Sequence, residues 1–129
     1  MATGKKSWSS QTQVIGTSDG YVNLSTTEVF SSDIDLETNG YEGAHVIVEI
    51  YYASSPTDEV TINFYGSLDG VNYDDTPFLS MQGDNGTDPQ QLSFIITGYA
   101  HIRIGLVQDG STDTHTARAY YQAWRWDIS

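Results

Sequence analysis

Apolar and polar residues alternate with a period of two along much of this chain, and this pattern predicts β-strands. The clearest example covers residues 41–53, where one face would carry Ala44, Val46, Val48, Ile50 and Tyr52. Successive side chains of a strand point to opposite sides, so such a segment can bury one face and expose the other. The same window is also the best candidate for a helix. Because its period is two rather than 3.6 residues, we expect no helix.

Further strands are expected, separated by turns rich in Asp, Gly and Ser. They cover residues 11–15, 21–24, 34–36, 59–67, 91–97, 99–108 and 115–128, with Met81 closing another short one. We expect the strands at 41–53 and 59–67 to form an antiparallel hairpin. The Asp109-Gly110 turn indicates a second hairpin, between the last two strands. Seven to nine strands with regular turns predict an all-β fold, an antiparallel β-sandwich of jelly-roll type.

The N-terminus has a different composition from the rest of the chain. Residues 1–10 are polar and rich in Gly, Ser and Lys, with one aromatic side chain, Trp8. We therefore expect a flexible N-terminal arm over residues 1–15 and a single β-sandwich domain over residues 16–129. Extended arms can add a strand to a neighbouring molecule. Our hypothesis is that residues 1–15 become ordered only on assembly.

The charge balance is strongly acidic. Five Lys and Arg residues stand against seventeen Asp and Glu residues, a net charge of −12, and two of the five cations are Lys5 and Lys6. Phosphate binding depends on clustered Lys and Arg, so we expect neither nucleic acid nor a membrane as a partner. No segment approaches the length of an apolar membrane span. Because no apolar run follows the two lysines, we expect no signal peptide and synthesis in the host cytoplasm.

Motifs for catalysis are missing from the sequence. It contains no Cys, no Gly-x-Ser-x-Gly elbow, no phosphate-binding loop and no His-Glu-x-x-His pair. Glu49 could pair with a second carboxylate across a sheet, as glycosidases require. A single Glu in a strand is more typically solvated or ion-paired, here with Arg103 or Arg118. We therefore expect that the chain is not an enzyme.

The densest group of oxygen ligands lies in one expected turn. Asp69, Asn72, Asp74 and Asp75 fall within seven residues, and Ca²⁺ binds six to eight oxygens of this kind. Their spacing does not match an EF-hand loop. Asp and Asn in Gly-containing turns also bond to their own backbone. We therefore expect no cofactor, with calcium at these four residues as the alternative.

The last expected strand is the most aromatic part of the chain. One face would carry Arg118, Tyr120, Gln122, Trp124 and Trp126, and the opposite face three alanines. Arg, Tyr and Trp are typical of the residues that contribute most to binding at interfaces. The same rings suit a platform for sugar stacking, and a third interpretation is that the two tryptophans close one end of the core. The candidate interface residues are Trp8, Arg118, Tyr120, Trp124 and Trp126.

Residues 64–78 carry a resemblance to a known group of proteins. They read Phe-Tyr-Gly-Ser-Leu-Asp-Gly-Val-Asn-Tyr-Asp-Asp-Thr-Pro-Phe, a strand followed by an Asx-rich turn and a Pro-aromatic pair. Together with residues 95–104 and the aromatic last strand, the pattern resembles small β-sandwich structural proteins of tailed bacteriophages. The resemblance covers roughly residues 44–128. In that group such domains decorate the capsid or form tail and fibre appendages, and they carry no catalytic residues.

The resemblance implies a structural protein of a virion, most specifically a capsid decoration (cement) protein that binds and stabilises the assembled shell. Its partners would be the major capsid protein or other virion subunits, and it would itself form a dimer or a trimer. The alternative is a carbohydrate-binding or adhesive tip module. In that case Tyr120, Trp124 and Trp126 would form the platform, and the loop at 69–75 would hold calcium.

Overall fold

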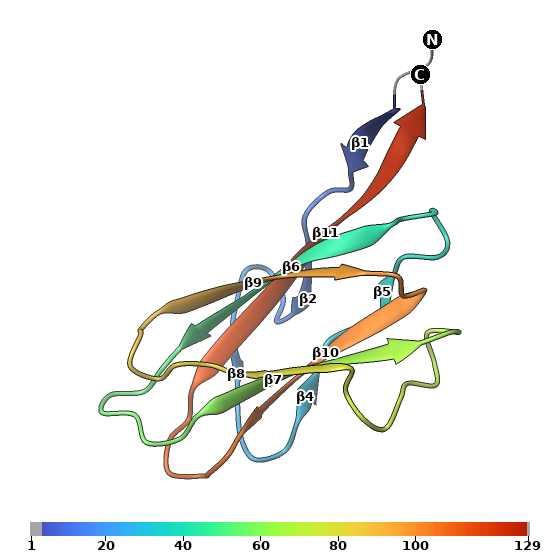
Figure 1. Ribbon diagram of the computed structural model, residues 1–129. Coiled ribbons are helices and arrows are strands. Elements are labelled where there is room, and N and C mark those ends of the chain that lie inside the picture. Colours follow the sequence, from blue (N-terminus) through green and yellow to red (C-terminus); the bar gives the residue numbers. More distant parts are fainter. Residues whose placement is uncertain (1–3, 129) are drawn as a thin grey trace.

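The computed structural model describes residues 4–128 as two antiparallel β-sheets packed face to face (Figure 1). In chain order the strands are β1 (Gly4–Trp8), β2 (Thr12–Ile15), β3 (Val22–Asn23), β4 (Val29–Phe30), β5 (Ile34–Asp35), β6 (Gly43–Tyr51), β7 (Val60–Ser67), β8 (Leu79–Gln82), β9 (Gln90–Thr97), β10 (His101–Gln108) and β11 (Thr116–Ile128). Within residues 4–128 no helix occurs, and hence none that could cross a membrane.

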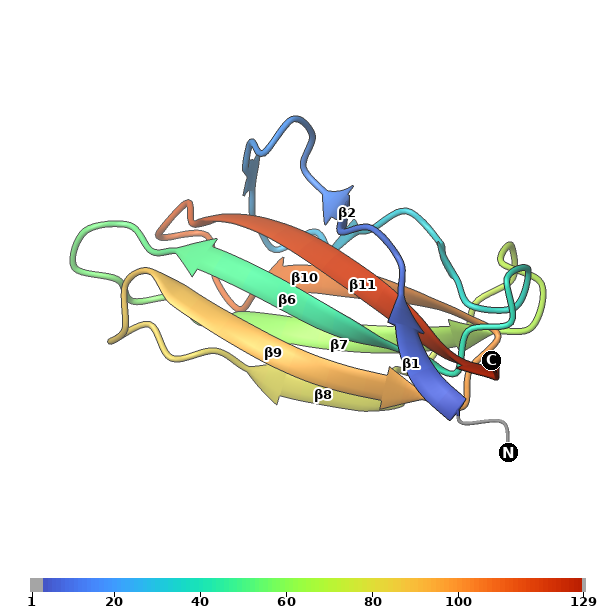
Figure 2. The same ribbon diagram turned by 90° about the horizontal axis from the view of Figure 1, so that it is seen from above.

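The last two strands of the chain lie in different sheets: β11 lies next to β6, and β10 lies next to β7. The first sheet has the order β1-β11-β6-β9, and β2 and β3 continue beyond β1 along the same edge of β11. The second has the order β4-β10-β7-β8, and β5 lies next to β4 along β10. Viewed from above, β6, β9 and β11 form one layer, and β7, β8 and β10 form the other (Figure 2). The two sheets contain six and five strands, and they form an antiparallel β-sandwich of jelly-roll type, so the predicted fold class is confirmed.

The core contains the inward-facing residues that the alternation predicts. These residues are fully buried on β6, β7 and β10: Ala44, Val46, Val48, Ile50, Val60, Ile62, Phe64, Ile102, Ile104 and Leu106. The ring of Phe64 packs on that of Phe94 from the opposite sheet, with 4.8 Å between the centroids. The alanine face of β11 is also fully buried, and its small side chains let the opposite layer approach closely.

Both predicted hairpins are wrong. β6 and β7 lie in opposite sheets, and so do β10 and β11, so their connecting turns cross the edge of the sandwich. Each of these strands has an apolar face that must be buried. The two strands of each predicted hairpin bury their apolar faces against the same core, one strand from each sheet. Instead of each other, β6 pairs with β11 and β7 pairs with β10, strands that lie further away in the sequence.

The two crossing turns are joined by reciprocal hydrogen bonds. The Asp113 carboxylate accepts the backbone N–H groups of Thr57 and Asp58, at 2.7 and 2.9 Å. In return the Asp58 carboxylate accepts the backbone N–H of Asp113, at 2.7 Å. The backbone donors lower the pKa of Asp113 below its usual value, because they stabilise its charged form. Part of the acidic composition therefore consists of turn carboxylates that accept hydrogen bonds from backbone N–H groups.

The predicted flexible arm over residues 1–15 is wrong for the residues that the structure describes. Gly4–Trp8 forms β1 and Thr12–Ile15 forms β2, and both pair with β11. Val14 and Ile15 are buried in the core, so the sandwich begins before residue 16. Residues 1–3 of the predicted arm lie outside the described residues. The N-terminal segments form strands because β6 covers only one edge of β11. They supply the backbone partners that the other edge needs.

The ends of β1 and β11 form a two-stranded ribbon that extends beyond the sandwich (Figure 1). The last residue of β11 that pairs with β6 is Trp124, opposite Gly43. From there to Ile128, β11 pairs only with β1 among the described residues. We call Gly4–Trp8 and Trp124–Ile128 together the terminal ribbon.

Replacing Phe64 by Ala tests whether this contact between the sheets supports the core. Phe64 is fully buried, so we expect Phe64→Ala to lower the free energy of unfolding by about 3–5 kcal/mol in urea titrations. The control Val71→Ala, at an exposed loop position, should change it by less than about 0.5 kcal/mol. A change below about 1 kcal/mol for Phe64→Ala would show that the two sheets do not depend on this contact.

Candidate functional site

One face of the terminal ribbon carries four large side chains. Lys6 lies directly opposite Trp126 and Trp8 directly opposite Trp124 in the antiparallel register. Directly opposite residues project from the same side of a strand pair, so all four side chains share one face. The sequence placed Trp124 and Trp126 on one face of a strand. Adding Lys6 and Trp8 to that face required the strand pairing.

The three tryptophans surround the Lys6 ammonium. Its nitrogen lies 5.6 Å from the ring centroid of Trp8, 5.1 Å from that of Trp124 and 5.6 Å from that of Trp126. The rings of Trp8 and Trp124 are 5.4 Å apart and tilted by 52°. Cation–π attraction acts at these distances, since the faces of aromatic rings are electronegative. We call Lys6, Trp8, Trp124 and Trp126 the tryptophan cluster.

The three rings differ in exposure. Trp124 is only 8% exposed, whereas Trp8 is 46% and Trp126 is 57% exposed. Trp124 lies over Gly43, where a Cβ atom would be 2.6 Å from the ring and 2.6 Å from the Ile96 carbonyl oxygen. A glycine at this position therefore provides the space for Trp124. The cluster thus has one ring fixed to the sandwich and two rings open to solvent.

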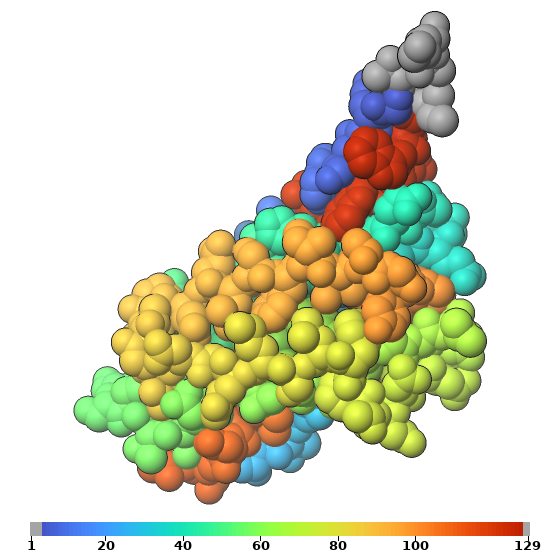
Figure 3. Space-filling view, viewed as in Figure 1, coloured from blue at the N-terminus to red at the C-terminus, as the bar shows by residue number. Residues whose placement is uncertain are grey.

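The terminal ribbon differs in charge from the rest of the molecule. Lys5, Lys6 and Arg125 against Asp127 give it a charge of 3 − 1 = +2. The total is −12, so the remaining residues carry −12 − 2 = −14. In the space-filling view the ribbon stands clear of the body (Figure 3). The ribbon is therefore a cationic, aromatic projection on an acidic body.

Two of the predicted interface residues belong to a different cluster, further along β11. The Arg118 guanidinium donates to Glu49 at 2.5 Å, one of the two ion pairs that the sequence considered for Glu49. Arg118 also donates to the Asp19 carbonyl, and the Tyr120 hydroxyl donates to the Asp19 carboxylate at 2.5 Å. The last bond raises the pKa of Tyr120. Arg118 and Tyr120 therefore hold the turn before β3, while Trp8, Trp124 and Trp126 come together in the ribbon.

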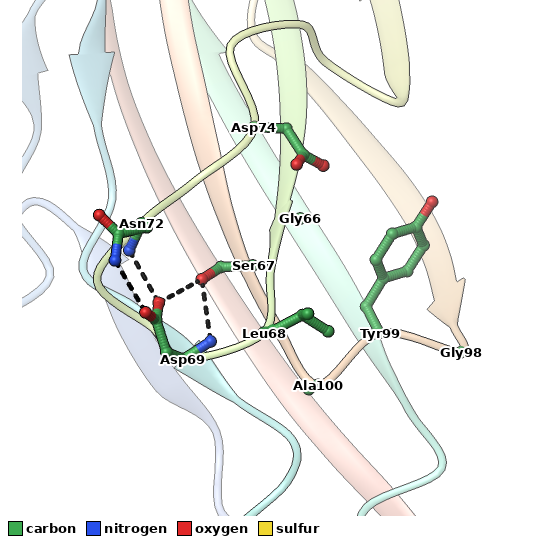
Figure 4. A pocket seen from close by; sticks show the side chains of 9 residues that line it. All are labelled: Gly66, Ser67, Leu68, Asp69, Asn72, Asp74, Gly98, Tyr99 and Ala100. Atoms are coloured by element: carbon green, nitrogen blue, oxygen red, sulfur yellow. Dashed lines mark hydrogen bonds between the residues drawn. The ribbon is translucent and has the colours of Figure 1, made fainter.

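In the turn at residues 69–75, the candidate calcium site, the oxygens of Asp69 accept hydrogen bonds from the turn itself (Figure 4). The Asp69 carboxylate accepts the backbone N–H groups of Val71 and Asn72, the Asn72 side-chain amide and the Ser67 hydroxyl. These donors hold the pKa of Asp69 far below its usual range. In Figure 4, Asp74 lies apart from Asp69, across a cleft of about 540 Å³.

Metal-ligating side chains do not converge in this turn or elsewhere in the described chain. Over residues 4–128, no group of three or more His, Asp or Glu residues is placed to hold a metal ion. The structure therefore does not bring Asp69, Asn72, Asp74 and Asp75 together as a ligand set. Asp69 and Asn72 instead bond within an Asx turn, which was the other interpretation of these residues.

A second cluster, on the outer face of the β10 sheet, was not found from the sequence. The guanidinium of Arg103 lies 3.9 Å from the ring centroid of Phe30 and 4.4 Å from that of Tyr73. Next to it, Asp33 accepts a hydrogen bond from the Tyr73 hydroxyl and pairs with Nδ1 of His101 at 2.8 Å. These residues come from β4, β10 and two loops, so no local motif could have indicated the cluster.

None of the protein-family models matches this chain, and no curated protein matches it either. The functional conclusion therefore depends on the jelly-roll fold, the terminal ribbon and the side chains described above.

The close approach of Trp124 to Gly43 leads to one prediction. In Gly43→Ala the new methyl group would meet both the ring and the Ile96 carbonyl, so Trp124 must move. We expect a loss of about 1–3 kcal/mol in unfolding free energy and a shifted Trp124 indole N–H signal in NMR spectra. In the control Gly4→Ala the new methyl group would make only an ordinary contact, 3.9 Å from the Asp127 carbonyl oxygen, and both should stay unchanged. An unshifted Trp124 signal in Gly43→Ala would contradict the described contact.

The pair formed by His101 and Asp33 predicts a pH dependence of stability. The hydrogen bond to Asp33 raises the pKa of His101 above its usual value of 6.5. A raised pKa means that protonated His101 stabilises the folded state. This stabilisation is fully present below pH 6.5 and is lost as the pH rises through the folded-state pKa. We expect an NMR titration to show a lower His101 pKa in Asp33→Asn than in the wild type. In urea titrations, His101→Gln should lack the fall in stability toward alkaline pH, and a fall equal to that of the wild type would refute the linkage.

Proposed function

We propose that this protein is a non-catalytic structural subunit of a virion, a capsid decoration protein that binds the assembled shell through its terminal ribbon. The observation that carries the proposal is the ribbon itself, a two-stranded projection with two open tryptophans. Particle binding would favour the assembled shell by mass action. The protein would be made in the host cytoplasm and act on the particle.

The exposed rings support a binding role for the ribbon. A two-stranded ribbon in water is only marginally stable by itself. Trp8 and Trp126 nevertheless expose about half of their surfaces on one face of it. Tryptophan is among the residues that contribute most to binding when a partner covers it. A partner that covers both rings would therefore stabilise the ribbon and gain affinity in the same step.

The free backbone edge of β1 supports the same role. Within the described residues β1 pairs only with β11, so its outer edge presents backbone N–H and C=O groups. A strand of the partner can add to such an edge. Lys5 and Lys6 on this edge disfavour indiscriminate strand pairing and favour an acidic partner surface. This arrangement replaces our earlier hypothesis of a disordered arm, because the strand available for pairing is already formed.

The acidic body supports an outward-facing position on the particle. A charge of −14 outside the ribbon would be repelled from an acidic shell surface, while the ribbon would be attracted. The molecule would therefore attach by the ribbon and hold the body away. Copies would group as dimers or trimers about the symmetry axes of the shell, with the major capsid protein or another virion subunit as the partner.

The carbohydrate-binding alternative has less support. Of its three platform rings, Tyr120 and Trp124 are each only 8% exposed, so they do not form an open flat surface with Trp126. Tyr120 is also bonded to Asp19. The calcium part of this alternative relied on Asp69, which accepts four hydrogen bonds within its own turn.

A binding assay with particles tests the proposal. Particles of the virus that encodes the chain would be prepared without this protein, mixed with purified protein and sedimented. We expect the wild type to saturate the particles and Trp8→Ala/Trp126→Ala to bind at least about 30-fold more weakly, since each ring is expected to contribute at least about 1 kcal/mol. Both rings are about half exposed and lie outside the core, so the double variant should keep the wild-type urea midpoint.

Two further proteins serve as controls in this assay. Leu68→Ala/Val71→Ala removes exposed apolar surface in a loop outside the ribbon and should bind like the wild type. Deletion of residues 1–8 should abolish binding, whereas a deletion through residue 15 would also remove the buried Val14 and Ile15. Full occupancy by the double tryptophan variant, or absence of the protein from native particles, would refute the proposal.

A further inference from the structure

Lys6 binds aromatic rings although the chain is rich in carboxylates. Within residues 4–128 its ammonium has no carboxylate within ion-pair distance, in a chain with seventeen Asp and Glu residues. It lies instead within 5.6 Å of all three ring centroids of the tryptophan cluster. The cluster therefore already holds an ammonium group, supplied by the chain itself.

A cleft of about 840 Å³ opens next to this ammonium. The ribbon lines one side through Lys6, Trp124 and Trp126, and the connections before β6 and after β9 line the other. Those connections contribute two further aromatic rings, Tyr41 and Tyr99, and two carboxylates, Glu37 and Glu42.

The two carboxylates of the cleft are not used by the fold. Among the described residues, the side chains of Glu37 and Glu42 take part in no hydrogen bond and no ion pair. Most other turn carboxylates, such as Asp69 and Asp113, cap backbone N–H groups. The cleft thus combines aromatic faces with two available negative charges, and its single cation, Lys6, belongs to the terminal strand β1.

This combination selects one ligand chemistry. Aromatic faces attract weakly hydrated organic cations, and alkylated ammonium groups are the ligands that such sites recognise. Anionic ligands are disfavoured by the two carboxylates and by the acidic body. Divalent metal ions prefer a cage of oxygen ligands, and the cleft supplies ring faces in place of most of them.

We propose that the junction of the tryptophan cluster and this cleft binds a quaternary or methylated ammonium group. Lys6 occupies the ammonium position in the free protein and acts as a tethered competitor that the ligand displaces. The ligand group can belong to a choline-type headgroup or to a methylated lysine of a protein. This proposal does not rest on the role in a virion, because a small cation can bind whether or not a particle does.

Titration with choline, followed by the indole N–H signals in NMR spectra, tests the site. We expect saturable binding to Lys6→Ala with an affinity at least about tenfold higher than to the wild type, because the internal competitor is gone. Lys5→Ala is the matched control, since Lys5 lies on the opposite face of the ribbon, and it should bind like the wild type. Trp126→Ala introduced into Lys6→Ala should abolish saturation.

Two probes separate charge from shape and identify the source of the ligand. The uncharged isostere 3,3-dimethylbutanol has the shape of choline and should bind Lys6→Ala at least about fivefold more weakly. Phosphocholine and a trimethyllysine peptide then distinguish a headgroup from a protein source. Equal binding of choline and the uncharged isostere, or no saturable binding of any probe to Lys6→Ala, would overturn the proposal.

A measurement on the wild type keeps the test independent of any effect of Lys6→Ala on the ribbon. In the free protein the methylene protons next to the Lys6 nitrogen should be shifted upfield by the three rings. Saturating choline should move them toward the values of an exposed lysine. Unchanged Lys6 signals at saturation would refute the displacement of the Lys6 ammonium by choline. The particle sedimentation assay, carried out without choline, tests the virion role separately.

Discussion

Backbone pairing along β11 is the constraint on which the rest of the structure depends. This strand has 13 residues, and its two edges need partners over nearly all of that length. β6 covers one edge, and three short N-terminal strands cover the other in succession. The alanine face of β11 lets the opposite sheet pack closely, and its outward face carries both the Arg118 cluster and the tryptophan cluster. The strand continues past β6, and this overhang creates the ribbon.

The distribution of charge follows from the same architecture. Turn carboxylates such as Asp58, Asp69 and Asp113 cap backbone N–H groups where the chain crosses between sheets or reverses. The strand faces remain nearly neutral, and the ribbon collects three of the five cations. The acidic composition is therefore mainly a property of the loops. It leaves the terminal ribbon as a separate aromatic surface suited to partners or cations, which is the basis of both proposals.

Alternation of apolar residues predicted the inward faces of β6, β7, β9 and β10, because burial of one face depends only on local side-chain order. Ala44 to Ile50 and Ile102 to Leu106 are buried as that pattern requires. The pattern does not determine which strand lies beside which. β6 and β7 therefore looked like a hairpin, although the turn between them crosses the sandwich. The arm was misjudged for a related reason, since polar strands such as β1 are held by backbone bonds that side-chain composition does not reveal.

The sequence by itself determined the all-β class, the buried faces, the lack of catalytic motifs and the aromatic character of the last strand. Each of these depends on neighbouring residues in the chain or on composition. Only the tertiary structure decided that Trp8 and Lys6 meet Trp124 and Trp126, that Arg118 and Tyr120 belong to another cluster, and that Asp69 serves its own turn. The first of these outcomes depends on the register between β1 and β11, which lie more than one hundred residues apart in the sequence, and that register is chosen by the packing of the whole sandwich. The Asp69 turn is local, but the sequence left both of its interpretations open until the hydrogen bonds were known.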